Sequence, residues 1–302
     1  MAKASALHAQ LVKALGPGYL RNEFKAVRRR GVDGCFGWLL EDLEFETKDG
    51  ALILAYFLRP PVDHAPVPAV VYCHAHGNNY AVGRDELTLG RPALQSPYAK
   101  DLVALGCAAL CIDMPCFGAR QEPAESALSK ALAWQGDTLF GTMLGEQAAA
   151  ISFLAAQPMV QAGRIGAMGF SMGSTLAWWL AALDERILAA SAMCSFADLG
   201  SLVGLGAHDG HGHYMTVPGL LNIARSGEIA ALIAPRALQI CVGLQDWSTP
   251  EPAFARARQD LEAGYSQGGD LRFHIEPEQG HVEPPAMRAA VLDFLRDTLI
   301  AP

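Results

Sequence analysis

The chain has 302 residues, of which 51% are hydrophobic and 18% are charged. This is long for one average domain but within the range of a single large α/β domain with insertions, and the apolar content predicts a sizeable core with little disorder. A formal net charge of -8 argues against a surface that binds nucleic acid or an acidic membrane. The one basic cluster, residues 28–30, is short and is interpreted as a solvated helix end.

The N-terminus and the cysteines indicate the compartment. Residues 1–20 lack the apolar centre of a secretory signal, and no apolar run is long enough for a membrane span. The seven cysteines are odd in number and several lie in apolar runs, so they are interpreted as free thiols in a reducing compartment. The spacing of Cys107, Cys111 and Cys116 does not match a zinc pattern. We therefore expect a cytoplasmic protein.

The first 40 residues are predicted to be helical, because Leu7, Leu11 and Leu15 fall on one helical stripe. Residues 1–40 are expected to form an N-terminal helical cap, and residues 41–302 the catalytic domain. Two segments of alternating polarity, 43–47 and 51–57, are separated by an Asp-Gly pair that tolerates the positive φ angles of a tight turn. These segments predict a β-hairpin.

From residue 67 onward, apolar runs alternate with segments of helical periodicity. The runs cover residues 67–74, 107–113, 164–170, 187–194, 236–243 and 271–276. Strands without polar alternation are typical of a parallel sheet buried on both faces. The sequence therefore predicts an α/β fold, in which a mostly parallel, doubly wound sheet follows the N-terminal antiparallel hairpin and carries helices on both faces.

The most specific motif is Gly-Phe-Ser-Met-Gly at residues 169–173, between a predicted strand and a predicted helix. A strand that ends in Gly-x-Ser-x-Gly and leads into a helix is typical of a nucleophile elbow, whose tight turn exposes the serine hydroxyl. Ser171 is the predicted nucleophile. The alternative interpretation is a glycine-rich turn in which the serine caps the helix.

A serine hydroxyl needs a base to remove its proton and a carboxylate to orient that base. Asp246 follows the predicted strand 236–243, and His281 follows the predicted strand 271–276. The carboxyl ends of parallel strands meet at one sheet edge, so Ser171, Asp246 and His281 are predicted to meet there. Taken singly, Asp246 would be an ordinary turn residue and His281 a loop histidine.

The developing oxyanion needs backbone N–H donors, one after the nucleophile and one after the strand that ends near residue 73. Met172 is predicted to supply the first donor and His76 the second. His74 and His76 are expected to act through backbone and scaffold rather than as acid or base.

A histidine-rich stretch, residues 208–214, alternates imidazole and carboxylate groups. A metal site is one interpretation, but a glycine-interrupted loop over the active-site edge is favoured, and whether residues 200–222 act as a lid stays open. The side chains predicted for the substrate pocket, for which core packing is the alternative, are Trp134, Phe140, His213, Tyr214 and Trp247.

At these motifs the sequence resembles the α/β-hydrolase superfamily, within it the dienelactone hydrolase-like and acetyl xylan esterase-like branch. Residues 74–79, 111–120, 169–173, 233–238 and 280–281 carry the resemblance, which runs from about residue 40 to the end. It implies a hydrolase with a Ser-His-Asp triad and no cofactor or metal. Dienelactone hydrolases have a cysteine at the elbow where this chain has Ser171, so dienelactone is not the expected substrate.

The expected function is that of a serine carboxylesterase, which cleaves small-molecule esters of small or medium acyl groups through an acyl-enzyme. Acyl transfer to another acceptor, or peptide hydrolysis, are alternatives on the same fold. The chain is also similar to the catalytic domain of prolyl oligopeptidases but has no room for their propeller. A protein of the same fold that binds ligands without catalysing a reaction is a further alternative. Whether the chain forms a homodimer is left open.

Overall fold

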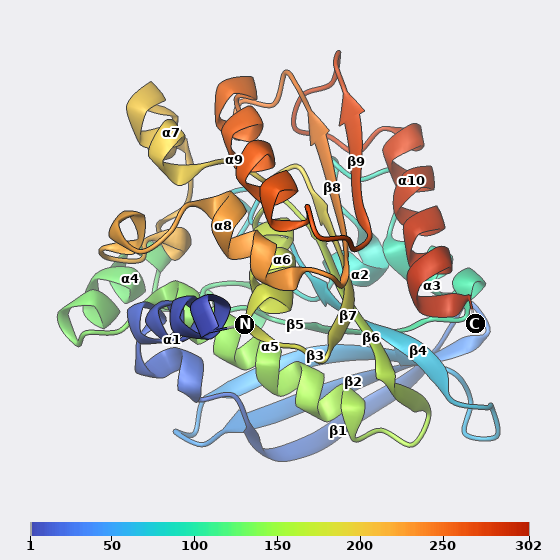
Figure 1. The fold of residues 1–302 in the computed structure, drawn as a ribbon. Helices are drawn as coiled ribbons and strands as arrows, with labels where there is room; N and C mark the ends of the chain where they lie inside the picture. Colours follow the sequence, from blue (N-terminus) through green and yellow to red (C-terminus); the bar gives the residue numbers. More distant parts are fainter. Residues whose placement is uncertain (1, 302) are drawn as a thin grey trace.

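The computed structural model describes residues 2–301 and contains one nine-stranded sheet in the order β1-β2-β3-β5-β4-β6-β7-β8-β9 (Figure 1). The strands are β1 (Phe24–Cys35), β2 (Trp38–Thr47), β3 (Leu52–Arg59), β4 (Val67–Cys73), β5 (Ala108–Ile112), β6 (Val160–Phe170), β7 (Ile187–Met193), β8 (Ala237–Gly243) and β9 (Leu271–Glu276). β1, β2, β3 and β5 pair antiparallel, and the pairs from β5 to β9 are parallel. The hairpin and the six later strands are confirmed.

Helices cover both faces of the sheet, as predicted. They are α1 (Ala2–Leu15), α2 (Glu86–Leu89), α3 (Tyr98–Leu105), α4 (Glu125–Trp134), α5 (Leu139–Ala155), α6 (Met172–Leu183), α7 (Leu199–Leu205), α8 (Ser226–Ala230), α9 (Glu251–Gly264) and α10 (Pro285–Leu295). Short helical turns are η1 (Pro17–Leu20), η2 (Gly118–Arg120), η3 (Ala207–Gly210), η4 (His213–Met215), η5 (Leu220–Asn222), η6 (Ala231–Ile233) and η7 (Arg296–Ile300). Within residues 2–301, no helix is long and apolar enough to cross a membrane.

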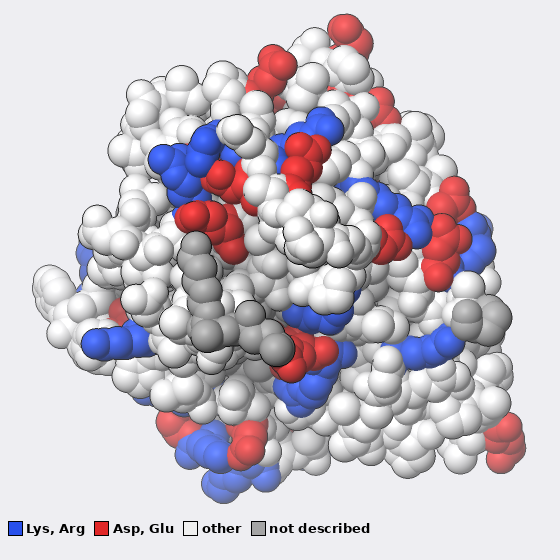
Figure 2. Space-filling view, viewed as in Figure 1, with Lys and Arg blue, Asp and Glu red and all other residues white. Residues whose placement is uncertain are grey.

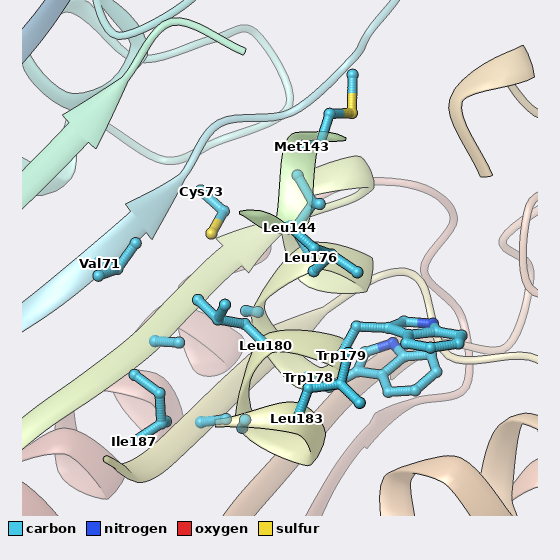
Figure 3. Packing of buried hydrophobic residues seen from close by; sticks show 14 of the residues in the cluster. Val71, Cys73, Met143, Leu144, Leu176, Trp178, Trp179, Leu180, Leu183 and Ile187 are labelled. Carbon is cyan, nitrogen blue, oxygen red and sulfur yellow. The ribbon is translucent and has the colours of Figure 1, made fainter. Parts of the chain in front are cut away.

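The central strands divide the core into two halves, because successive side chains of a strand point to opposite faces. In β4, Val71 and Cys73 belong to the cluster that includes α5 and α6, as Figure 3 shows for α6. Val70 and Tyr72 belong to the cluster that includes α3 and α10 on the other face, which Figure 1 shows at the right. All seven residues of β4 are buried, which explains its continuous apolar sequence.

The strand order locates the crevice at which a doubly wound sheet binds ligands. The chain passes from β4 outward to β5 and then returns to β6 on the other side of β4. Ligands of such sheets bind beyond the carboxyl ends of the strands, where the winding direction reverses. Here that point lies between the ends of β4 and β6, which lead into residues 74–79 and the 169–173 motif.

The helical prediction for residues 1–40 is correct only for α1 and for the short turn η1. Residues 24–35 form strand β1, which pairs with β2 across a tight turn in which Phe36 and Gly37 both have positive φ angles, 50° and 85°. Because nearly all of β1 is exposed, its sequence lacks the apolar period that marks a strand. This segment therefore extends the sheet instead of capping it.

Arg28, Arg29 and Arg30 accordingly lie on β1 and not at a helix end. They form ion pairs with the acidic residues Glu44, Glu41 and Asp42 of β2. On the face drawn in Figure 2, positive and negative side chains are intermixed. All seven cysteines are free, and six are buried while Cys35 is partly buried.

Candidate active site

Ser171 occupies a strained turn between β6 and α6. Its φ and ψ angles are 57° and -119°, a conformation that residues other than glycine rarely adopt. The two glycines of the motif permit close packing around the turn. A Cβ on Gly173 would lie 1.9 Å from the carbonyl oxygen of Cys73, and one on Gly169 would lie 2.4 Å from the carbonyl carbon of Gly173. Backbone crowding therefore explains the Gly-x-Ser-x-Gly sequence.

Hydrogen bonds connect Ser171, His281 and Asp246 in one chain. Ser171 Oγ lies 2.9 Å from His281 Nε2, and His281 Nδ1 lies 2.7 Å from Asp246 Oδ2. When Nδ1–H donates to the carboxylate, Nε2 is left as an acceptor for the serine hydroxyl. The structure thus brings together three side chains that the sequence places after β6, β8 and β9.

Ser248, which was not predicted for the site, fixes the Asp246 carboxylate. Its backbone N–H and hydroxyl both donate to Asp246 Oδ1, at 2.8 and 2.7 Å. Asp246 is almost fully buried, so these bonds also compensate for its lost hydration. The spacing Asp-x-Ser is a signal for this turn, because aspartate side chains commonly accept from the backbone two residues later.

The rings of His74 and His76 bind neighbouring groups instead of the serine. His74 Nε2 accepts from the N–H of Met114 at 3.1 Å, so Nδ1–H donates to the carbonyl oxygen of Ala75. Burial lowers the pKa of His74 to about 3, so the ring is neutral. His76 Nδ1 accepts from the N–H of Asn78, so its Nε2–H donates to Glu125 at 2.8 Å.

Glu125, the first residue of α4, joins three segments around the site and was missed by the sequence analysis. Its Oε2 accepts from His76 and from Tyr80 Oη at 2.8 and 2.7 Å, and its Oε1 accepts from the N–H of Tyr214 at 2.7 Å. Burial alone would raise the pKa of Glu125, but the hydrogen bonds from His76 and Tyr80 outweigh burial, and the pKa is lowered. An ionised carboxylate therefore holds these segments together.

A second buried carboxylate, Glu86, supports the loop that follows β4. It accepts from the N–H of Ala75 and from Tyr72 Oη, and Arg91 donates to it. Arg91 also donates to the carbonyl oxygens of Ala75 and His76. This network fixes the backbone at His76. Met172 is the first residue of α6, and the backbone N–H groups of the first turn of a helix have no partners within that helix.

Ser171 opens into a cavity of about 220 Å³ between residues 76–78, residues 210–214 and the loop after β8. Its lining residues are His76, Gly77, Asn78, Ser171, Ser195, Gly210, His211, Gly212, Tyr214, Trp247, Ser248 and His281. The predicted pocket residues Tyr214 and Trp247 belong to this lining. Ser195 and His211 were not predicted for the pocket.

The other three predicted pocket residues lie elsewhere. Phe140 lines a small hollow next to the cavity, and His213 lines a separate cavity of about 380 Å³. Trp134 is 90% exposed at the end of α4. Because a helix rises about 1.5 Å per residue, Trp134 lies roughly 13 Å along the helix from Glu125. The pocket prediction is therefore wrong for Trp134, and His213 faces a different cavity.

The glycines of the 208–214 stretch allow it to approach the site closely. A Cβ on Gly212 would lie 2.8 Å from Glu125 Oε1 and 2.9 Å from His76 Nε2, and one on Gly210 would lie 2.7 Å from the Trp247 ring. Within residues 2–301, no group of three or more His, Cys, Asp or Glu side chains is arranged to hold a metal ion. The stretch therefore packs as a close-fitting loop over the cavity.

Solved structures with this architecture define the class. Acetyl xylan esterase from Paenibacillus sp. R4 has a TM-score of 0.65 at 20% identity, over 99% of this chain and 93% of that one. Acetyl xylan esterase 1 from Thermoanaerobacterium sp. JW/SL YS485 has a TM-score of 0.64 at 17% identity, over 98% and 93%. The fold is therefore that of the α/β-hydrolases.

Sequence comparison assigns the family. The model of the dienelactone hydrolase family matches residues 95–281. The protein named "Putative hydrolase YtaP", from Bacillus subtilis (strain 168), is 36% identical over 248 residues, which are 81% of this chain and 83% of that protein. The chain belongs to the dienelactone hydrolase family, as the motifs predicted.

Proposed function

We propose that this member of the family is a serine carboxylesterase that hydrolyses esters of small or medium acyl groups. The observation that carries the proposal is the hydrogen-bonded chain from Ser171, in its strained turn, through His281 to Asp246. This chain lies at the edge of a cavity of about 220 Å³, which suits a small acyl group. Similarity to acetyl xylan esterases supports ester hydrolysis.

In the first step, Ser171 Oγ attacks the ester carbonyl carbon while its proton passes to His281 Nε2, from which it lies 2.9 Å. The carbonyl oxygen becomes an oxyanion that accepts from the backbone N–H groups of Met172 and His76. The C–O bond to the alcohol then breaks, and the His281 imidazolium returns the proton to the leaving oxygen. The product of this step is an acyl-serine.

In the second step, His281 removes a proton from water, and the hydroxide attacks the acyl-serine. Collapse of the second oxyanion releases the carboxylic acid and restores Ser171. Asp246 keeps the Nδ1–H tautomer of His281 and stabilises its charged form, 2.7 Å away. The reaction needs no cofactor or metal, and its partner is a small-molecule ester.

The serine at residue 171 favours ordinary esters over the dienelactone after which the family is named. A hydroxyl is activated only when His281 takes its proton, whereas a thiolate is a nucleophile in its own right.

The free thiols, six of them buried, support a reducing compartment such as the cytoplasm.

The test is hydrolysis of p-nitrophenyl acetate by the wild-type protein and by Ser171→Ala and His281→Ala. Each substitution is expected to lower kcat by about four orders of magnitude or more, the scale seen for other triads. Retention of most activity by Ser171→Ala would contradict the proposal. A fluorophosphonate probe should label the wild-type protein at Ser171, and absence of labelling would favour a silent binding scaffold instead.

A further inference from the structure

Two further cavities adjoin the one that contains Ser171, and both lie against residues 200–222, the segment named here the covering segment. The first is a hollow of about 20 Å³, which also reaches α6. The second has a volume of about 380 Å³ and is larger than the catalytic cavity of about 220 Å³. The cavity that contains Ser171 thus has two neighbouring cavities that the proposed reaction does not involve.

The larger cavity has a mainly apolar wall. Its apolar side chains come from α7 and from the segment that follows it, and they are Leu199, Leu202, Val203, Met215, Val217, Leu220 and Leu221. Four of these, Leu199, Leu202, Met215 and Leu220, also line the small hollow. The polar side chains of the lining are His208, Asp209, His211, His213 and Thr216. The apolar part of this wall gains free energy from contact with an alkyl chain.

Among the described residues, His211 alone lines all three cavities. The catalytic cavity shares with the hollow only His211 and the two small residues Ser195 and Ser248. It shares with the larger cavity only His211 and Gly212. The imidazole of His211 is therefore the one bulky group at both boundaries.

The His211 ring packs near Trp247 and forms a hydrogen bond with the backbone of Ser248. It lies 5.9 Å from the Trp247 ring, between centroids, and its Nε2 has no hydrogen-bond partner within residues 2–301. Burial lowers the pKa of His211, so the ring is neutral. Removal of the ring therefore breaks no hydrogen bond at Nε2, but it removes the hydrogen bond between His211 and the backbone of Ser248.

We propose that His211 is a specificity-determining residue whose ring separates the catalytic cavity from the apolar cavity and so limits the substrate to short acyl chains. This inference rests on the proposed esterase function. An acyl chain longer than the catalytic cavity must pass the position of the ring before its methylenes reach the apolar wall. Each methylene that reaches it is worth about fourfold in affinity.

The experiment compares kcat/KM for p-nitrophenyl acetate and p-nitrophenyl octanoate. In the wild-type protein, acetate is expected to be the better substrate. His211→Ala is expected to raise the octanoate-to-acetate ratio by about tenfold or more, because the ring no longer blocks the passage. An unchanged ratio in a folded His211→Ala protein would overturn the inference.

His211→Phe provides the matched control, because it keeps a planar ring of similar size and removes both ring nitrogens. It is expected to retain the preference for acetate. A ratio that rises equally in His211→Phe and His211→Ala would mean that the ring nitrogens and not the bulk set the preference, which also contradicts the inference. Thermal unfolding and fluorophosphonate labelling of Ser171 show that each variant is folded with an intact site.

Failure of the inference is distinguishable from failure of the proposed function. If the wild-type protein hydrolyses neither ester and Ser171 is not labelled, the esterase proposal itself is wrong. If the wild-type protein hydrolyses acetate and Ser171 is labelled, but the ratio stays constant in His211→Ala, only the role of His211 is wrong. In the second case the covering segment does not select the acyl chain.

Discussion

The sheet edge and the covering segment contribute to the site in different ways. Ser171, Asp246 and His281 follow the parallel strands β6, β8 and β9, of which β6 and β8 are hydrogen-bonded on both sides and β9 forms the edge of the sheet. The covering segment instead consists of most of α7 and the short turns η3, η4 and η5. The groups proposed for chemistry thus stand at the ends of sheet strands, and His211, which is proposed for selectivity, stands between short helical turns.

This difference has a physical basis. Catalytic groups must keep their geometry within about half an ångström, which packed strands provide. A binding surface only has to exclude or admit a chain, which a loop can do. Substitutions at the sheet edge are therefore expected to change kcat strongly, whereas those in the covering segment should change substrate preference.

After Ser171→Ala and His281→Ala, the largest expected effect comes from one of a pair of glycines that contrast the two regions. A Cβ on Gly173 would lie 1.9 Å from the carbonyl oxygen of Cys73, whereas one on Gly204 in α7 would meet nothing within 4 Å. Gly173→Ala must therefore displace the elbow, and we expect a loss of about 100-fold or more in kcat. Gly204→Ala should leave kcat unchanged and stabilise α7 by about 0.5 kcal/mol.

Kinetics with p-nitrophenyl acetate and urea unfolding of both variants measure this contrast. The expected destabilisation by Gly173→Ala is about 1–3 kcal/mol, as for other overpacked sites. If Gly173→Ala retained wild-type kcat, close packing at the elbow would not position the serine. If Gly204→Ala were as damaging, the two regions would not differ in the way described.

A smaller effect is expected at Glu125, which links the two regions. A carboxylate accepts at both oxygens, but the amide of Glu125→Gln accepts at one only and presents donors at the other. In the wild-type protein one carboxylate oxygen accepts from His76 and Tyr80, and the other accepts from the N–H of Tyr214. The amide cannot accept all three of these hydrogen bonds. We expect kcat to fall about tenfold while Ser171 still reacts with a fluorophosphonate.

The pH dependence of stability provides an independent measurement on Glu125. Its pKa in the folded protein lies below the ordinary value of 4.5, so the folded state favours the ionised form. The stability gained is therefore present above pH 4.5 and is lost as the pH falls through the lowered pKa. The difference in unfolding free energy between wild type and Glu125→Gln should shrink below pH 4.5, and Glu122→Gln, the same substitution at an exposed position, serves as the control variant.

The sequence predicts the sheet edge well because its signals are local. Strands β4 and β5 are uninterrupted apolar runs, and β7 and β8 each contain a single polar residue. The residues that follow β6, β8 and β9 stand at the positions at which parallel strands end together. The Gly-x-Ser-x-Gly motif adds a constraint from backbone crowding. The meeting of Ser171, Asp246 and His281 follows from topology alone, without knowledge of side-chain packing.

The surroundings of the edge depend on contacts between distant segments and could not be predicted in the same way. Glu125 is the first residue of a helix that is otherwise mostly exposed, and only its bonds to His76 and Tyr214 reveal its position. β1 has a polar, exposed sequence and is recognisable only by its pairing with β2. The three cavities that His211 lines exist only because the covering segment packs against the sheet edge, so no local sequence pattern marks them.

The smallest expected effects separate two tryptophans that look alike in sequence. Both are exposed, Trp134 by 90% and Trp247 by 55%, but only Trp247 lines the catalytic cavity, with its ring centroid 5.8 Å from that of His281. Trp247→Ala removes aromatic surface from the edge of the cavity, where an aromatic contact with the substrate would be worth about 0.5–1.5 kcal/mol, so KM for a p-nitrophenyl ester should rise about two- to tenfold, with a smaller change in kcat. Trp134→Ala should change neither value. Equal effects of the two substitutions would mean that the edge of the cavity at Trp247 does not contact the substrate.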